Sequence, residues 1–171
     1  MRFGQGLAPG TRVLDLACGH GRNARWFAQR GCLVTAVDVD PACEGSLGNR
    51  PGIRFILADL EAGPWPLGNE RFDAVVVVHY LHRPLLGRIR AAIGPGGLLI
   101  YETFARGNER FGRPRNPDFL LRPGELLTAF AGLRIIAFED GYVAKPPAVT
   151  QRLAALNCEP DHATPVEALA I

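Results

Sequence analysis

The chain has 171 residues, of which 47% are hydrophobic and 21% charged, so it is long enough for one domain with a sizeable core and too apolar to be disordered. Its net charge of +2 gives no global case for nucleic-acid binding, no apolar run approaches the roughly 18 residues of a membrane span, and the opening residues lack the apolar core of a signal peptide. Because the 4 cysteines show no C-x-x-C spacing, we expect reduced thiols in a cytoplasmic protein and no metal site at Cys18, Cys32, Cys43 and Cys158.

The first elements along the chain are the most informative. An apolar run over 11–16 predicts a strand, a glycine turn over 18–21 follows it, and the segment 23–30 is compatible with a helix. A second apolar run over 32–38 ends in Asp38. Strand, glycine turn, helix, strand and acid are together typical of a βαβ unit that binds a nucleoside, whose ribose diol can donate two hydrogen bonds to the carboxylate.

The glycine turn limits the kind of nucleoside. Gly19 and Gly21 lack a Cβ atom, so we expect a sharp turn at the surface where a ligand approaches the backbone closely. Residues 19–24 also fit the G-x-G-x-x-A form of the dinucleotide fingerprint, which keeps a nucleotide-binding oxidoreductase as an alternative. Asp15 argues against that alternative, because a carboxylate repels a pyrophosphate and attracts a cofactor with a cationic amino-acid end.

The middle of the chain continues the alternation of strands and helices. Apolar runs over 53–58, 72–78 and 97–103 predict three further strands. The run over 72–78 is continuously apolar, as expected for a parallel strand covered on both faces. A helix is expected over 83–93, where it precedes a Gly-Pro-Gly-Gly turn.

Two connections in this part of the chain are expected to be irregular. The segment 60–71 holds two prolines and two glycines, so we expect a loop where the alternating pattern calls for a helix. Gly45 and Gly48 interrupt the helix that would follow the second strand, so that helix is also in doubt at this stage.

Two motifs carry a family resemblance. Asp-Leu-Ala-Cys-Gly-His-Gly at 15–21 resembles the first motif of the class I S-adenosylmethionine-dependent methyltransferases, and the Pro-Gly-Gly turn at 95–97 resembles another hallmark of that family. Gly-Arg-Asn at 21–23 is most similar to the small tellurite-resistance-type members. The resemblance implies S-adenosyl-L-methionine as cofactor. The cofactor-binding residues that it implies are Asp15, Ala17, Cys18, Gly19, Gly21, Asn23, Asp38, Val39, Asp59, Leu60 and His79.

The C-terminal part predicts a helix over 122–130 and two last strands over 133–139 and 149–156, which can pair as a hairpin. The methyltransferase fold is similar in ending with such a hairpin. We therefore expect an α/β, Rossmann-like class I methyltransferase fold, a mostly parallel seven-stranded sheet with an antiparallel C-terminal hairpin strand. A single domain is expected over 1–158, followed by a short tail over 159–171.

The segment 104–121 follows the fifth expected strand and therefore leaves it on the ligand side of an open parallel sheet. Few residues precede the first strand, so we expect a cover for the cofactor to come from elsewhere, with this segment as the candidate, from a partner subunit, or not at all. Two interpretations stay open, a substrate lid and a solvated loop. If it is a lid, Arg113 and Arg115 are candidates to recognise an anionic substrate by paired hydrogen bonds.

Candidate catalytic groups follow the fourth and fifth strands. Methyl transfer requires an aligned nucleophile and, where that nucleophile is protonated, a group that takes its proton. His79 is the best candidate for a general base, although it is equally compatible with packing over the cofactor. Tyr80 is a second catalytic candidate and Tyr101 a substrate contact, and both are equally compatible with a place in the core.

These features predict an S-adenosylmethionine-dependent methyltransferase that acts on a small polar or anionic acceptor. The alternative is an inactive S-adenosylmethionine-binding sensor or assembly subunit. The expected partner is a small-molecule substrate without membrane association, and a homodimer and a nucleic-acid partner stay open. Neither the identity of the acceptor nor the atom that is methylated follows from the sequence.

Overall fold

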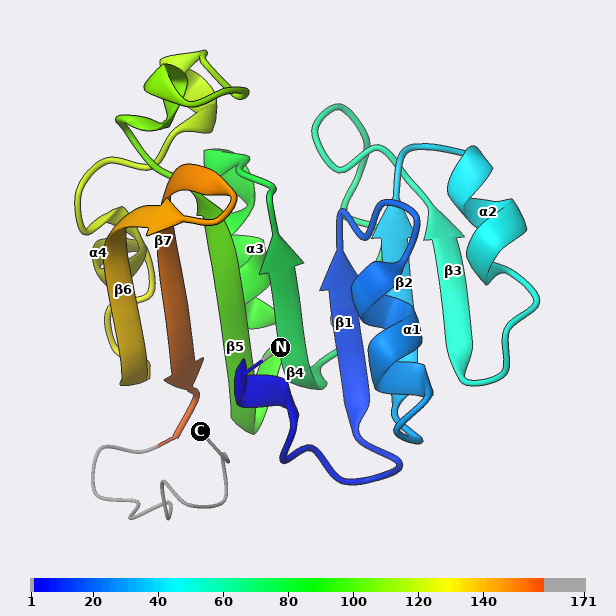
Figure 1. Ribbon diagram of the computed structural model, residues 1–171. Helices are drawn as coiled ribbons and strands as arrows, with labels where there is room; N and C mark the ends of the chain where they lie inside the picture. Colours follow the sequence, from blue (N-terminus) through cyan, green and yellow to red (C-terminus); the bar gives the residue numbers. More distant parts are fainter. Residues whose placement is uncertain (1, 159–171) are drawn as a thin grey trace.

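A computed structural model describes residues 2–158 as a seven-stranded sheet flanked by helices (Figure 1). The strand order is β3-β2-β1-β4-β5-β7-β6. The strands are β1 (Arg12–Leu16), β2 (Leu33–Asp38), β3 (Ile53–Leu57), β4 (Phe72–Val78), β5 (Ile93–Phe104), β6 (Arg134–Ala144) and β7 (Pro147–Leu156). The pairs among β1 to β5 are parallel, whereas β7 lies antiparallel between β5 and β6. The predicted fold class is confirmed.

Short helices connect these strands. They are α1 (Arg22–Ala28), α2 (Ala42–Leu47), α3 (Leu86–Ala91) and α4 (Glu125–Ala129), with 3-10 turns η1 (Arg2–Gly4), η2 (Arg83–Leu85), η3 (Asn108–Arg110) and η4 (Pro117–Phe119). α1 lies on one face of the sheet, and α3 and α4 lie on the other (Figure 1). This is the two-layered covering that a largely parallel sheet needs, because both of its faces are apolar.

Alternation along the strands divides the core in two. Val75 and Val77 of β4 pack with Phe130 into the cluster that α3 and α4 cover. Val76, between them in sequence, packs with Phe27 of α1 into the second cluster. Because neighbouring side chains on a strand point to opposite faces, a continuously apolar strand supplies both clusters at once.

Several boundaries differ from the expected ones. The helix after β2 forms despite its two glycines, because Cys43 and Leu47 pack it into the core and Gly48 lies at its C-terminal cap, outside the helix. β5 begins at Ile93, before the glycine turn, since that residue still pairs with Phe72 ahead of a register shift. The expected loop over 60–71 is confirmed. No helix within residues 2–158 is long and apolar enough to cross a membrane, and the expected tail over 159–171 lies outside the described residues.

Candidate functional site

The strand order places the carboxyl ends of β1 and β4 side by side, where the connections leave in opposite directions. Ligands of open α/β sheets bind at such a switch point. Ala17, directly after β1, and His79, directly after β4, have φ angles of 50° and 58°, and no other non-glycine residue within 2–158 has a positive φ. Such backbone strain concentrates at functional sites, so both criteria select the same edge of the sheet.

The glycine turn after β1 is held in place by hydrogen bonds to β2. The Cys18 amide donates to the Val37 carbonyl at 3.1 Å, and the Gly19 amide donates to Asp38 Oδ2 at 2.7 Å. Asp38 Oδ1 accepts from the Asp40 amide at 3.0 Å. Each carboxylate oxygen has room for another donor, so Asp38 is fixed in place and can still accept two hydroxyl groups.

Gly19 and Gly21 have different structural roles. Gly19 has φ of 52°, and a Cβ built on it meets no atom within 4 Å, which leaves an open space above the turn. Gly21 is buried, and a Cβ there would lie 2.2 Å from Leu47 of α2. The expectation that both glycines lie at the surface is therefore wrong for Gly21, whose missing side chain makes room for a neighbouring helix rather than for a ligand.

Asp15 lies beneath the turn with 1% of its surface exposed. Burial raises its pKa to about 7, partly offset by hydrogen bonds from the Ala24 backbone and the Asn23 side chain. Its Oδ2 atom has no hydrogen-bond partner within residues 2–158. A buried acid with a free acceptor next to the turn favours a cationic ligand group nearby.

Three residues that the family resemblance assigns to the cofactor site follow the second and third strands, and it implies that two of them, Asp59 and Leu60, flank the adenine. Val39 directly follows Asp38 and is 60% exposed, whereas Leu60 is buried. Asp59 is held by its own loop, because its Oδ1 accepts from the Glu61 amide at 2.8 Å and from the Ala62 amide at 3.0 Å. Both bonds lower the pKa of Asp59, and the bond from Ala62 contributes more than the bond from Glu61. The adenine contacts themselves stay a prediction.

His79 has the surroundings of a proton acceptor. Its ring stacks on Phe104 with centroids 4.7 Å apart, and Nε2 lies 3.9 Å from Oε1 of Glu102. Burial lowers its pKa, with Glu102 opposing and Arg22 and Arg152 adding to the shift. The imidazole is therefore neutral at pH 7 and can take a proton, while the carboxylate stabilises the imidazolium that forms.

The two tyrosines after and within the neighbouring strands are less suited to proton transfer. Tyr101 has 0% exposure, packs on Phe130, and donates from its hydroxyl to the Tyr80 carbonyl at 3.0 Å. Its ring and hydroxyl are therefore engaged in the core, whereas the residue also lines the pocket described below, so its assignment as a substrate contact stays a prediction. Burial raises the pKa of Tyr80, and the nearby carboxylates of Glu61 and Asp59 raise it further. Proton loss from Tyr80 is unfavourable at neutral pH, which leaves His79 as the better base.

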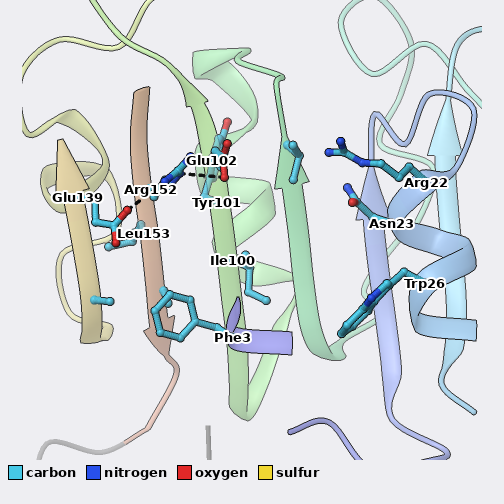
Figure 2. Close-up of a pocket in the computed structure, with 13 residues that line it drawn as sticks. Phe3, Arg22, Asn23, Trp26, Ile100, Tyr101, Glu102, Glu139, Arg152 and Leu153 are labelled. Carbon is cyan, nitrogen blue, oxygen red and sulfur yellow. Dashed lines mark hydrogen bonds and ion pairs between the residues drawn. The ribbon is translucent and has the colours of Figure 1, made fainter. Parts of the chain in front are cut away.

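A pocket of about 470 Å³ lies on the α1 side of the sheet. Its lining includes Val78 and Glu102, of which the first precedes His79 in the chain and the second lies 3.9 Å from its imidazole, so we call it the pocket next to His79, which itself is not a lining residue. Its rim holds a row of ion pairs in which Arg152 Nε is 3.1 Å from Glu102 and Arg152 Nη1 is 3.2 Å from Glu139 (Figure 2).

Arg22 and Trp26 line this pocket from α1. Of the lining residues, sequence reasoning named Asn23 and Tyr101. It did not single out Arg22 and Trp26, although they are one helical turn apart directly after the glycine turn.

The segment 104–121 lies above the carboxyl end of β5 and is pinned at its base (Figure 1). Asn108 is buried, and its Oδ1 accepts from the Val149 amide at 3.2 Å. Arg83 donates to the Leu120 carbonyl at 3.0 Å. Arg113 and Arg115 are exposed and are absent from the pocket lining. A role of the segment as a lid therefore stays a prediction, and the anchored base limits motion to its tip.

S-adenosylmethionine, the cofactor that the sequence resemblance implies, fits these residues. The open space above Gly19 admits a ligand close to the backbone, and Asp38 presents two acceptor sites to a ribose diol. The free oxygen of Asp15 suits a cofactor that carries an ammonium and a sulfonium charge. Arg22 at the start of α1 complements the carboxylate of the methionine part.

Known proteins resemble this chain in both sequence and fold. Residues 13–97 match the family model of a methyltransferase domain. An uncharacterized methyltransferase of Mycobacterium tuberculosis is 38% identical over 109 residues, which cover 58% of this chain and 54% of that protein. The chain thus spans about half the length of this curated relative.

Two solved structures share the fold. TehB from Haemophilus influenzae superposes with a TM-score of 0.72 at 19% identity, over 88% of this chain and 58% of that one. An S-adenosylmethionine-dependent methyltransferase from Mesorhizobium loti gives a TM-score of 0.69 at 20% identity, over 87% and 92% of the two chains. At these identities the likeness establishes the architecture, and the chemistry has to be argued from the site.

Proposed function

The chain belongs to the class I S-adenosylmethionine-dependent methyltransferases, and we propose that it transfers the methyl group of this cofactor to a small polar acceptor held at the carboxyl ends of β4 and β5. The observation that carries the proposal is the pairing of an open backbone turn at Gly19 with a fixed acceptor carboxylate at Asp38. The helix that follows this turn, α1, lines the pocket next to His79 with Arg22 and Asn23.

A narrower form of the proposal is that the acceptor is anionic. Only this narrower form requires that Arg113 and Arg115 contact the acceptor.

The residues divide the work of the reaction. When bound, S-adenosylmethionine supplies a methyl group activated on a sulfonium, with a neutral thioether as the leaving group. Asp38 and the Gly19 turn bind and orient the cofactor, and the pocket next to His79 orients the acceptor. The neutral imidazole of His79 takes the proton of the acceptor's nucleophilic atom, and Glu102 then stabilises the positive charge.

The test is binding of S-adenosylhomocysteine, measured by titration calorimetry. Gly19→Ala places a methyl group in the open space above the turn, so we expect the affinity to fall at least about tenfold. Gly96→Ala is the matched control, because Gly96 also has a positive φ, of 71°, and open space around its Cβ, yet lies at the opposite end of the sheet.

Equal affinities of the two alanine variants would contradict the assignment of the turn. Binding by the wild type without transfer of a labelled methyl group to any offered acceptor would instead favour the sensor or assembly role. The two results are separable, because the first concerns the cofactor site alone and the second concerns catalysis.

A further inference from the structure

One face of the sheet lacks a covering helix over part of its width. α1 contacts β1, β2 and β3, while α3 and α4 contact β5 and β7 from the opposite side. On the α1 side of β4, β5, β7 and β6, the described chain places only the single turn η1 (Figure 1). The pocket next to His79 lies on this uncovered surface, with Phe3 of η1 at its lower end (Figure 2).

The strand register arranges this surface in rows of opposite character. The row nearest the carboxyl end of β4 consists of Val78, Glu102, Arg152 and Glu139. The next row consists of Val76, Ile100, Ala154 and Ala137. The rows are two residues apart along each strand, or about 6.6 Å. A ligand that spans both rows therefore meets ion pairs at one end and small apolar side chains at the other.

Two aromatic side chains form the walls of this groove. Phe3 and Trp26 both line the pocket, from η1 and α1 respectively (Figure 2). The ring of Trp26 is fixed by Arg30, whose guanidinium lies 3.6 Å from the ring centroid, and by a T-shaped contact with Phe27, in which the two ring centroids are 4.9 Å apart. At about 470 Å³ the groove falls in the size range of small-molecule sites. Two alanines in its floor leave the space that larger side chains would fill.

We propose that this groove binds the apolar body of the methyl acceptor, and that the acceptor is an amphipathic hydroxyl compound with its hydroxyl beside Glu102 and a flat or narrow apolar body over Ile100 and Ala154. That this ligand is the methyl acceptor rests on the proposed function. The proposal names the substrate class of that site.

The charges in the upper row select the head group. Two carboxylates, from Glu102 and Glu139, flank the guanidinium of Arg152 in this row. The other guanidinium in the pocket lining, that of Arg22, is assigned above to the carboxylate of the methionine part, so with cofactor bound the row favours a hydrogen-bond donor over a carboxylate. A methyl acceptor also needs a lone pair on its nucleophilic atom. A neutral hydroxyl satisfies both conditions. Held beside Glu102, the hydroxyl can direct its single proton to Nε2 of His79, which lies 3.9 Å from the same carboxylate.

The experiment measures binding of phenol, 4-ethylphenol and 4-butylphenol by calorimetry. We expect the dissociation constant to fall about fourfold for each methylene added, the ratio for burying that group. In a Trp65→Phe background Trp26 is the remaining tryptophan of the 2 in the chain, and its fluorescence should change in parallel. We expect 4-butylbenzoate to bind about tenfold more weakly than 4-butylphenol, and Glu102→Gln to narrow that gap.

Two matched variants locate the ligand. Ala137→Phe fills the groove from β6 and should weaken 4-butylphenol at least about tenfold, whereas Ala144→Phe on the same strand, outside the pocket lining, should leave it within about twofold. Affinity that does not change with chain length, or equal loss in both variants, overturns the proposal. So does a dimer that buries Trp26 and excludes the phenols. Binding of S-adenosylhomocysteine is measured in parallel, and its failure would refute the proposed function while leaving the phenol result to stand independently.

Discussion

The two halves of the sheet build their functional groups in different ways. Around β1, β2 and β3 the site is made largely of backbone, with the Gly19 amide bound to Asp38 and open space above the turn. Around β4, β5, β7 and β6 it is made of side chains, with Glu102 and Arg152 paired across neighbouring strands. The first half is therefore sensitive to any added Cβ, and the second to single charges and side-chain volumes. Variants in either half test this division.

The largest expected effect lies in the second half, at His79. Asparagine tolerates its positive φ of 58°, so His79→Asn should fold and lose the proton acceptor. We expect kcat for methylation of a 4-alkylphenol to fall by roughly 10²- to 10⁴-fold. Because burial lowers the pKa of His79 from the ordinary 6.5, wild-type kcat should stay level at neutral pH and decline only below pH 6.5.

The comparison requires that His79→Asn leaves the cofactor half of the site, around β1, β2 and β3, unchanged. S-adenosylhomocysteine affinity of His79→Asn should stay within about twofold of the wild type, as calorimetry can check. A kcat within about threefold of the wild type would mean that His79 only packs in the site.

A second prediction concerns the buried carboxyl of the first half. The pKa of Asp15 is about 7 in the folded protein against 3.8 for an ordinary aspartate. As the pH rises, the unfolded chain therefore loses this proton before the folded protein does. The contribution of Asp15 to the free energy of unfolding thus decreases between about pH 4 and 7, by an amount on the order of 4 kcal/mol. Asp15→Asn removes this dependence.

Urea unfolding at several pH values measures the effect. The stability of Asp15→Asn relative to the wild type should be highest at pH 8 and should decline toward pH 4. A difference that is the same at both pH values would show that Asp15 is not held in a proton-retaining environment.

Asp38 tests the cofactor half more directly. Asp38→Ala removes the acceptor for the ribose hydroxyls and should weaken S-adenosylhomocysteine by about one to two decades, or roughly 1–3 kcal/mol. Asp73→Ala is the matched control, because Asp73 also accepts a backbone amide, from Arg12 at 2.8 Å, on the opposite edge of the sheet. Phenol binding should be unchanged in both variants. Loss of phenol binding in Asp38→Ala would show that the two halves of the site do not bind their ligands independently.

The smallest expected effect belongs to the exposed arginines of the segment 104–121. Replacing Arg113 and Arg115 by alanine should weaken an anionic probe such as 4-butylbenzoate by about two- to tenfold, since exposed charges contribute about 0.2–1 kcal/mol each. S-adenosylhomocysteine affinity should not change. The charge-matched control replaces Arg71 and Arg88 by alanine. An equal loss of 4-butylbenzoate affinity in that control would mean that the effect comes from the net charge of the protein and not from a contact with Arg113 and Arg115.

The sequence alone predicted those features that depend on residues close together in the chain. The turn at 17–21, the acid at Asp38, the parallel order of the strands and the closing hairpin all followed from glycines, apolar runs and their spacing. The core role of Tyr101 did not follow, because the face of a strand toward which a side chain points depends on register with its neighbours.

What the sequence determined by itself is the half of the site contained in one continuous stretch, 13–38, where turn chemistry and strand endings fix the geometry locally. Only the tertiary structure decided the other half, since it brings Glu102, Glu139 and Arg152 into one row from three strands that are distant in sequence. It also decided that Gly21 makes room for Leu47 rather than for a ligand. The physical reason is that register, packing and the choice of covered face are set by contacts between distant segments, which no local pattern records.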